Sequence, residues 1–359
     1  MFWQNSIEVI QPGKNYWISF ILCLLFFTSC ASAKEKQKAP KVLTEDFYAV
    51  GLVYHRFNDA RYPSTNTPDD KFEAHLEYLL DNGFKTYTAS NLYSNSNDSV
   101  KKIFITIDDG LKSFYTNGWS LLKKHNCQAT LFVNTESVGW GDYMNWEQIR
   151  EVHKAGIEIG SHSHQHNYFL NYPDSMREKA FKADLEVAEK LFMDSLGFIP
   201  KVYAYPYGEF DKQMSDVLKE KGYDLAFAQN SGVWSNETNL LCIPRFPVAG
   251  NYVGMQQFKL KVNMKPMKVS GLNDYPIELN EAALFSSTLK PESGHTFRSL
   301  NFFFNNKYND KVDTFNGDSI KVALHMPASS RRVLYTITAQ DKNNQWHWWS
   351  KLFINTNIR

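Results

Sequence analysis

Strand-like and helix-like segments alternate from Tyr48 to about Phe246, and this alternation constrains the fold more than any other feature of the sequence. Short runs of β-branched and aromatic residues are separated by segments with helical periodicity, which is typical of βα units around a parallel sheet. We predict seven strands, at residues 48–54, 85–87, 102–107, 129–134, 157–160, 202–205 and 225–228. This number of units indicates an α/β fold, an irregular (β/α)7 barrel that is closed or nearly closed, with its chemistry at the carboxyl ends of the strands.

Turn and capping residues mark the ends of three helices between these strands. Thr67-Pro68 is a helix start and Gly83 a helix end. The same logic predicts helices at residues 145–155 and 174–196, ended by Gly156 and Gly197. In the first helix, four apolar residues are expected to share a buried face: Phe72, Leu76, Leu79 and Leu80.

The pattern changes after about Gly250, where helical periodicity fades and turns rich in Asn, Gly and Pro become frequent. Alternating segments such as residues 332–338 predict a small β-sandwich. We therefore divide the body of the chain into a barrel domain at 46–262 and a C-terminal β-sandwich domain at 263–359. Three tryptophans of the second domain are either core residues, which is the commoner role, or platforms for sugar rings: Trp346, Trp348 and Trp349.

The N-terminus resembles an export signal. Lys14 precedes an apolar run at residues 16–27, which is shorter than the roughly 20 residues that cross a bilayer. Small residues next to Cys30 resemble the bacterial lipoprotein cleavage box, although Phe27 stands where leucine is usual. We expect a lipoprotein signal peptide at 1–30, a lipid on Cys30 that anchors the protein to a membrane, and a polar tether at 31–45. The alternatives are ordinary cleavage near residues 31–33 and an uncleaved anchor.

Charge and cysteine content exclude two classes of protein. The formal net charge is +1, from 39 basic and 38 acidic residues, so there is no field that would recruit nucleic acid, and a neutral polymer is a suitable partner. Once the signal peptide is removed, Cys127 and Cys242 remain, too few for a disulfide framework. Both lie beside apolar runs, which favours buried free thiols over a single bridge. Nothing in the sequence fixes an oligomeric state.

Two carboxylates and a glycine follow the predicted strand at 102–107. Side chains alternate along a strand, so Asp108 and Asp109 should point in different directions, one toward a metal ion and one toward its water. Gly110 permits a sharp turn. The three residues alone are a weak signal, because aspartate and glycine are ordinary turn formers.

A histidine cluster, Ser161-His162-Ser163-His164-Gln165-His166, follows the predicted strand at 157–160. The four-residue spacing would let His162 and His166 meet one cation if the segment makes a helical turn, and imidazole suits borderline metals. With one aspartate they would form a set of two nitrogens and one oxygen with open positions, which is typical of catalytic metal sites. The alternative is a polar loop with incidental histidines.

These two motifs resemble those of the polysaccharide deacetylases with the NodB-homology domain, carbohydrate esterase family 4. Residues 106–110, Thr-Ile-Asp-Asp-Gly, match the first motif and residues 162–166, His-Ser-His-Gln-His, match the second. The resemblance covers 48–246 and implies that Asp109, His162 and His166 bind one divalent metal ion, zinc before cobalt or nickel, and that Asp108 is the general base. It also implies a third motif at residues 205–208, in which the backbone N–H of Tyr207 stabilises the oxyanion.

The sequence departs from the family pattern at two roles. The third motif lacks its usual arginine, and Arg245 either replaces it or forms a surface ion pair. The late Leu-x-His that supplies the acid is absent from the end of the barrel, since His325 lies in the β-rich tail. His55 ends the first predicted strand and resembles the acid of the subgroup that deacetylates poly-β-1,6-N-acetylglucosamine; the alternative is a packing or capping histidine.

The sequence therefore predicts an exported, membrane-anchored lipoprotein facing the periplasm or the cell exterior. We expect a hydrolase that removes N-acetyl groups from an N-acetylglucosamine polysaccharide, with poly-N-acetylglucosamine favoured and a chitin-like or peptidoglycan glycan as the other substrates. A non-catalytic carbohydrate-binding lipoprotein on the same barrel is the alternative, since sites rather than folds carry function. A metal-independent amidase is a third interpretation, which would be expected to lack a metal ligand.

Overall fold

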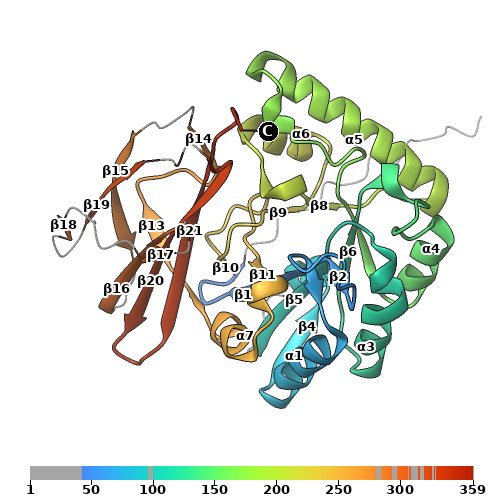
Figure 1. Ribbon diagram of the computed structural model, residues 1–359, viewed down its shortest axis with the longest axis horizontal. Helices are drawn as coiled ribbons and strands as arrows, with labels where there is room; N and C mark the ends of the chain where they lie inside the picture. The colour runs from blue at the N-terminus through green and yellow to red at the C-terminus, as the bar shows by residue number, and fades with distance from the viewer. Residues whose placement is uncertain are drawn as a thin grey trace, which may run out of the picture. The chain divides into compact units, whose positions relative to one another are not determined.

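Nine strands form a curled sheet that is parallel except at one edge, in the order β10-β1-β5-β6-β7-β8-β9, with β4 beside β5 and β11 beside β1 (Figure 1). The strands are β1 (Tyr48–Tyr54), β4 (Phe84–Tyr87), β5 (Lys101–Ile107), β6 (Thr130–Val133), β7 (Glu158–Ser161), β8 (Val202–Ala204), β9 (Leu225–Phe227), β10 (Val233–Ser235) and β11 (Phe246–Pro247). All seven predicted strands are present, with ends that differ by at most one residue. The computed structural model describes residues 43–95, 100–279, 284–292, 297–305, 307–308, 314–315, 319–325, 327 and 329–358.

The curled sheet is not a closed ring of seven strands. A segment at residues 240–247 spans the gap between β9 and β1. On one side, the N–H of Ile243 donates to the carbonyl of Ala226 at 2.9 Å. On the other, Phe246 of β11 pairs with Leu52 of β1. The gap is thus bridged by an irregular connection, and this connection carries Arg245.

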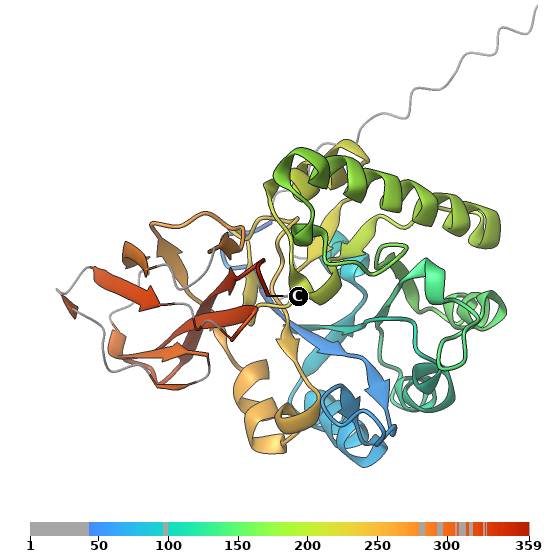
Figure 2. The same ribbon diagram turned by 45° about the horizontal axis from the view of Figure 1, so that its top comes forward.

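Helices surround the outside of the curled sheet, as both ribbon views show (Figures 1 and 2). They are α1 (Asp69–Asp81), α2 (Ala89–Ser94), α3 (Trp119–Lys124), α4 (Trp146–Lys154), α5 (Asp174–Leu196), α6 (Lys212–Glu220) and α7 (Met255–Val262). The three predicted helices are α1, α4 and α5. Asn145 begins α4 with a reciprocal capping box, and Gly197 ends α5 at φ 81°.

One predicted core position on α1 is wrong. Leu80 is 42% exposed, whereas His75 is fully buried beside Leu76. At 100° per residue, Leu80 lies roughly 90° from the centre of the stripe formed by the buried residues of this helix, and His75 lies nearer to it. The sequence pattern had placed the aliphatic residue on the shared face and gave no sign of the buried histidine.

Aromatic rings fill the interior of the curled sheet. Phe104, Phe132, Phe227 and Trp234 belong to one buried cluster. Glycines make room for these rings, since a Cβ on Gly51 would lie 2.2 Å from the ring of Phe104. The rings form an apolar floor beneath the carboxyl ends of the strands.

Two further sheets follow α7. The first has the order β12-β21-β20-β16-β17 with β14 beside β21, and the second has the order β13-β15-β19-β18. Their strands are β12 (Lys265–Pro266), β13 (Lys268–Ser270), β14 (Ile277–Glu278), β15 (Leu284–Glu292), β16 (Phe297–Phe304), β17 (Lys307–Tyr308), β18 (Thr314–Phe315), β19 (Ile320–His325), β20 (Arg332–Asp341) and β21 (Trp346–Ile354). Buried residues of both sheets belong to one hydrophobic cluster, and the short remaining strands β2 (Arg56–Phe57) and β3 (Asn66–Thr67) pair with each other.

The tryptophans of β21 are packing residues. Trp346 and Trp348 pack against the core of the barrel, and Trp348 meets Phe246 with ring centroids 5.3 Å apart. Trp349 alternates to the other face and packs into the cluster of the two C-terminal sheets. The described residues of the barrel and of these sheets therefore form one compact unit.

Cys127 and Cys242 are both free and buried, which confirms the prediction of free thiols. The predicted signal peptide, including Cys30, and residues 31–42 of the predicted tether lie outside the described residues. Within the described residues, no helix has the length and apolar character needed to cross a bilayer.

Candidate active site

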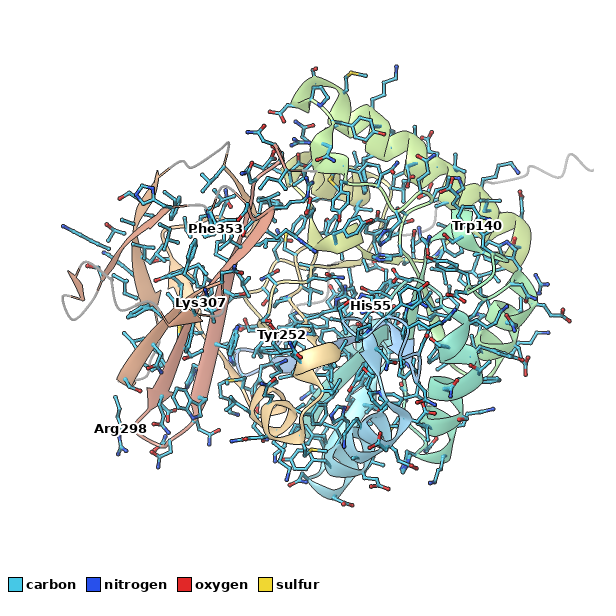
Figure 3. The ribbon with its side chains drawn as sticks, in the orientation of Figure 1. His55, Trp140, Tyr252, Arg298, Lys307 and Phe353 are labelled. Atoms are coloured by element: carbon cyan, nitrogen blue, oxygen red, sulfur yellow. The ribbon has the colours of Figure 1, made fainter. Side chains whose placement is uncertain are left out.

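The predicted site residues come from loops at the carboxyl ends of parallel strands in one sheet. His55 follows β1, Asp108 and Asp109 follow β5, and His162 follows β7. Figure 3 shows His55 at this end of the curled sheet. Parallel strands bring these loops to the same edge, so side chains that are more than 100 positions apart in the sequence lie close together.

Asp109, His162 and His166 converge on one point. The Nε2 atoms of the two histidines are 3.1 Å apart, and each lies 3.5 Å from Oδ1 of Asp109. Ligands held about 2.0–2.1 Å from a tetrahedral zinc ion are separated by roughly 3.3 Å, so these three atoms have the spacing that one ion requires. The set could hold a divalent metal ion and would leave coordination positions open.

The segment that carries the histidines is a tight loop and not a helical turn, so His162 and His166 meet without the helical geometry that their four-residue spacing suggested as a route. Ser163 and His166 adopt left-handed backbone conformations, with φ 68° and 56°. The hydroxyl of Ser163 accepts the N–H of His166 at 2.8 Å. His164 turns away and contacts the hydroxyl of Thr135 at 2.9 Å, so two of the three histidines reach the site.

A buried carboxylate on α5 holds this loop in place. Asp184 accepts the backbone N–H groups of His164 at 2.7 Å and of Gln165 at 2.9 Å. Burial raises the pKa of Asp184 in spite of these two bonds. Its position in the middle of a 23-residue helix gave no sequence signal for a role beside the histidines.

Neighbouring groups orient both histidines and tune their charge. Nδ1 of His162 lies 2.7 Å from the carbonyl of Ala204, which fixes the ring and leaves Nε2 facing Asp109. Burial, followed by the charge of His162, lowers the pKa of His166 to about 4, so its ring is neutral near pH 7. Burial acts to raise the pKa of Asp109, but the hydrogen bond to His162 and the nearby rings outweigh it, and the pKa is lowered. A neutral imidazole and an ionised carboxylate are the forms that bind a metal.

Asp109 owes its direction to the backbone turn after β5. It has φ 76°, and Gly110 follows at φ 69°. Two successive left-handed residues swing the chain away from the strand, so the two carboxylates diverge, as the alternation of side chains predicted.

Asp108 points to the interior, where Arg245 binds it with two hydrogen bonds. The distances are 2.7 Å from Nη1 to Oδ1 and 2.9 Å from Nη2 to Oδ2. Both side chains are fully buried, so Arg245 is not part of a surface ion pair. Burial acts to raise the pKa of Asp108, but the charge and hydrogen bonds of Arg245 lower it overall. The carboxyl group therefore stays ionised at neutral pH.

Arg245 is itself fixed by the end of the barrel. Its Nε donates to the carbonyl of Ala228, and Nη1 donates to the hydroxyl of Thr106, both at 2.9 Å. The guanidinium lies over the ring of Phe132, 5.5 Å from the centroid. Gln229 adds a weaker contact to Oδ2 of Asp108 at 3.4 Å. An arginine from the bridging segment thus occupies the place beside Asp108.

His55 and Tyr207 flank this centre. Nδ1 of His55 is buried and has no hydrogen-bond partner within the described part of the chain. The charge of His55 also contributes to the lowered pKa of Asp109, after burial and His162. Tyr207 adopts φ 58° and ψ 3° in the turn Pro206–Gly208, and its ring meets the edge of His166 with centroids 4.5 Å apart.

Sequence reasoning missed four residues that support the site. Two of them, Asp184 and Gln229, contact the histidine loop and Asp108. The other two lie beside Tyr207: Tyr168 stacks on its ring at 3.7 Å, and Glu209 is buried next to the turn. Each acts through a contact that the linear spacing does not reveal. His325 lies on β19, exposed and outside the barrel, as expected.

Comparison with known proteins shows which proteins this chain is similar to. Residues 95–226 match the polysaccharide deacetylase family. The chain is 28% identical over 207 residues to YxkH of Bacillus subtilis, whose name refers to polysaccharide deacetylase; the match covers 56% of this chain and 72% of that protein. It is 25% identical over 245 residues to a poly-β-1,6-N-acetyl-D-glucosamine N-deacetylase of Staphylococcus aureus, covering 60% and 84%.

The fold is also similar to solved structures. IcaB from Ammonifex degensii superposes with a TM-score of 0.52 at 25% identity, covering 61% of this chain and 98% of that one. The curled parallel sheet is thus shared with this solved structure. The strands that follow α7 lie beyond the family match at residues 95–226.

Proposed function

Because the chain belongs to the polysaccharide deacetylase family, we propose that it is a metal-dependent enzyme that removes N-acetyl groups from a polymer of N-acetylglucosamine. The observation that carries the proposal is the convergence of Asp109, His162 and His166, with their donor atoms 3.1 to 3.5 Å apart, beside a separate buried carboxylate. A metal-independent amidase has no need of such a donor set.

The roles of the side chains follow from their positions. Asp109, His162 and His166 would hold one divalent cation, with zinc favoured over cobalt or nickel because two imidazoles and one carboxylate suit these metals. When bound, the cation supplies Lewis acidity that polarises the acetyl carbonyl and makes water more acidic. Asp108 is ionised and can accept the proton of the attacking water, since among the residues that the structure describes Oδ1 accepts from Arg245 alone and has acceptor capacity left.

The remaining steps fall to residues at the rim of the site. The backbone N–H of Tyr207 donates to the oxyanion of the tetrahedral intermediate, where the charge is greatest. His55 then gives a proton to the departing amine, which needs an acid that is protonated near neutral pH. Arg245 fixes Asp108 through two hydrogen bonds. Collapse of the intermediate releases acetate and leaves a free amino group on the sugar.

For the substrate we favour poly-N-acetylglucosamine. Two observations support this choice. One is the name of the S. aureus relative. The other is the position of His55 at the end of β1, which resembles that of the acid in the subgroup that deacetylates poly-β-1,6-N-acetylglucosamine. Chitin-like and peptidoglycan glycans are the other candidates. The interpretation as a non-catalytic sugar-binding protein is not favoured, because a base and a donor set are both in place.

We also propose export, with a lipid on Cys30, and a β-sandwich built by the strands after α7. The export proposal is supported by the apolar run at residues 16–27 before a cysteine. It predicts that Cys30→Ser abolishes incorporation of labelled fatty acid into the protein. Labelling that persists in this variant would contradict it.

Acetate release tests the proposed activity. Protein that begins at Ala31 should release acetate from β-1,6-linked N-acetylglucosamine oligomers, lose the activity to a chelator, and regain it with zinc, cobalt or nickel. Chitin oligomers and peptidoglycan fragments, assayed in parallel, define the preference. His55→Ala should lower turnover by about 100-fold or more. Activity that survives full removal of metal would contradict the metal-dependent mechanism, and near-full activity of His55→Ala would contradict the assignment of the acid.

A further inference from the structure

The turn that carries Tyr207 is held from outside the barrel. The residues that hold it, Arg331 and Arg332, lie immediately before and at the start of β20, more than 100 positions beyond the end of the family match at residue 226. Nη1 of Arg332 donates to the carbonyl of Tyr207 at 2.7 Å. Arg331 binds the carboxylate of Glu209, two residues further on, with bonds of 2.8 and 2.7 Å.

The turn needs such support because its backbone is unusual. Tyr207 has φ 58°, a left-handed conformation that a residue with a Cβ rarely adopts. Gly208 continues the turn at φ 69°, and a Cβ there would lie 2.6 Å from Cβ of Gln229. Gln229 in turn contacts Asp108. The turn therefore packs closely against Gln229, beside Asp108. Because its backbone conformation is unfavourable, contacts with neighbouring residues must hold its peptide groups in place.

Glu209 is a buried carboxylate of the barrel whose cationic partners come from the C-terminal strands. Its carboxylate side chain is fully buried, and its cationic partners within the described residues are Arg331, at 2.7 Å, and Arg332, at 3.8 Å. A buried carboxylate without a partner is costly, so the residue requires the C-terminal strands. The guanidinium of Arg331 also lies over the ring of Tyr168, 4.3 Å from the centroid.

These contacts connect the C-terminal strands to the donor set. Tyr168 stacks on Tyr207 with the rings 3.7 Å apart and 6° from parallel. The ring of Tyr207 then meets His166. Arg331 and Arg332 thus reach the turn from two sides, one through its carbonyl and one through Glu209 and the aromatic pair.

We propose that Arg331 and Arg332 are positioning residues of the active site, which fix the Tyr207 turn so that its N–H points at the oxyanion. The proposal rests on the deacetylase function proposed above. It assigns to the C-terminal strands the task of completing the catalytic site of the barrel.

Arg332→Ala is the most direct test, because this side chain is 41% exposed and its loss should leave the fold intact. The oxyanion forms only in the transition state, so kcat should fall by about 10-fold or more while KM stays within about twofold. Arg332→Lys keeps a donor and should recover most of the loss. Arg298→Ala is the matched control, since Arg298 is an exposed arginine on β16 that contacts Asn344, and it should leave kcat and KM unchanged.

A second variant tests Arg331. Removing Arg331 alone would leave the Glu209 carboxylate buried without its nearer cationic partner. Glu209→Gln combined with Arg331→Gln replaces the ion pair by two neutral amides, and it should also lower kcat without a comparable rise in KM. Metal affinity, measured by calorimetry with zinc alone, should match that of the unaltered protein in every variant. A kcat within twofold of normal for Arg332→Ala, or a loss that appears in KM alone, would overturn the proposal.

Hydrogen exchange provides a measurement that does not need activity. The N–H groups of Gly208 and Glu209 bond within the turn, to the carbonyls of Tyr205 and Pro206. Their exchange should accelerate in Arg332→Ala but not in Arg298→Ala, while exchange in β1 stays constant. If the unaltered protein releases no acetate from any glycan, the proposed function has failed, and unchanged exchange in the turn would show separately that the two arginines do not position it.

Discussion

Two adjacent side chains of the candidate site have different partners and, in the proposed mechanism, different roles. Asp108 and Asp109 are adjacent in sequence but face different partners, Arg245 in one case and two histidines in the other. Because Asp108 is outside the proposed ligand set, its charge can be removed without removing a ligand.

Asp108→Asn tests this division. The amide retains the shape of the side chain and can accept from Arg245, but it cannot take a proton from water. We expect kcat to fall by about 100- to 10,000-fold, with zinc still bound at normal stoichiometry. Asp109→Asn is the companion variant and should weaken zinc binding instead. Measured turnover above a tenth of normal in Asp108→Asn would show that another group is the base.

Arg245 allows a stability prediction at the same scale. Arg245→Met leaves the Asp108 carboxylate buried without its partner, and breaking such a pair costs about 3–5 kcal/mol. Replacing both residues, Asp108→Leu with Arg245→Met, removes both charges and should cost much less. Urea unfolding of the single and double variants measures the difference. If the double variant is no more stable than the single one, the loss of unfolding free energy comes from packing and not from the unpaired buried charge.

Elements of secondary structure were easier to predict than the loops between them. The strand at 48–54 and the helix at 174–196 have the predicted bounds, because a run of β-branched and aromatic residues, a helical period and the cap at Gly197 are local signals. For residues 162–166 the spacing suggested only that a helical turn would let the two histidines meet, and the structure has a tight loop instead. Its left-handed residues depend on Asp184 of α5, a tertiary contact that no local pattern contains.

The candidate site shows the same limit. The motifs predicted that Asp109, His162 and His166 lie close together, and the structure has them so, since parallel strands must bring their carboxyl ends together. The pairing of Arg245 with Asp108 was one of two open alternatives, because it depends on how the segment at residues 240–247 crosses the gap in the sheet. Glu209 and Arg331 lie 122 positions apart, and neither belongs to a recognisable pattern.

The contact between α1 and the segment before α7 makes a pH-dependent contribution to stability. His75 is fully buried: Nε2 lies 3.0 Å from the carbonyl of Val253, and its ring stacks on Phe258. Burial lowers the pKa of His75 to about 4 from 6.5. Between these values the unfolded chain binds more protons than the folded one, so stability is lost as the pH falls through this window.

His75→Gln removes this titration and can still bond to Val253. Metal should be removed from both proteins, so that only folding is compared. Between pH 7 and pH 4.5 the unaltered protein should lose about 2 kcal/mol more of its free energy of unfolding than the variant. Urea unfolding at the two pH values checks this, and equal losses would mean that His75 is charged in the folded state.

At the scale of the whole molecule, the C-terminal strands and the barrel are expected to unfold together. Their boundary contains apolar contacts, such as Trp348 against Phe246, and the buried ion pair of Arg331 with Glu209. Separating them would expose the aromatic rings to water and leave the Glu209 carboxylate without its cationic partner. Both effects raise the free energy of a state in which only one part is folded. The two parts should therefore share one transition even though each has its own hydrophobic cluster.

Ile337→Ala tests this coupling from the far side of the boundary. Ile337 is fully buried on β20 in the C-terminal cluster, and the truncation should cost about 2–5 kcal/mol. In protein that begins at Ala31, the remaining cysteines report on two places: Cys127 in the barrel core, and Cys242 beside Leu352 of β21. Labelling should be measured under conditions where global unfolding exposes the thiols. If the two parts unfold in one transition, Ile337→Ala accelerates the labelling of both thiols by the same factor. Faster labelling of Cys242 alone would show that the C-terminal strands open while the barrel stays folded, and the support that Arg331 and Arg332 give to the active site would then be intermittent.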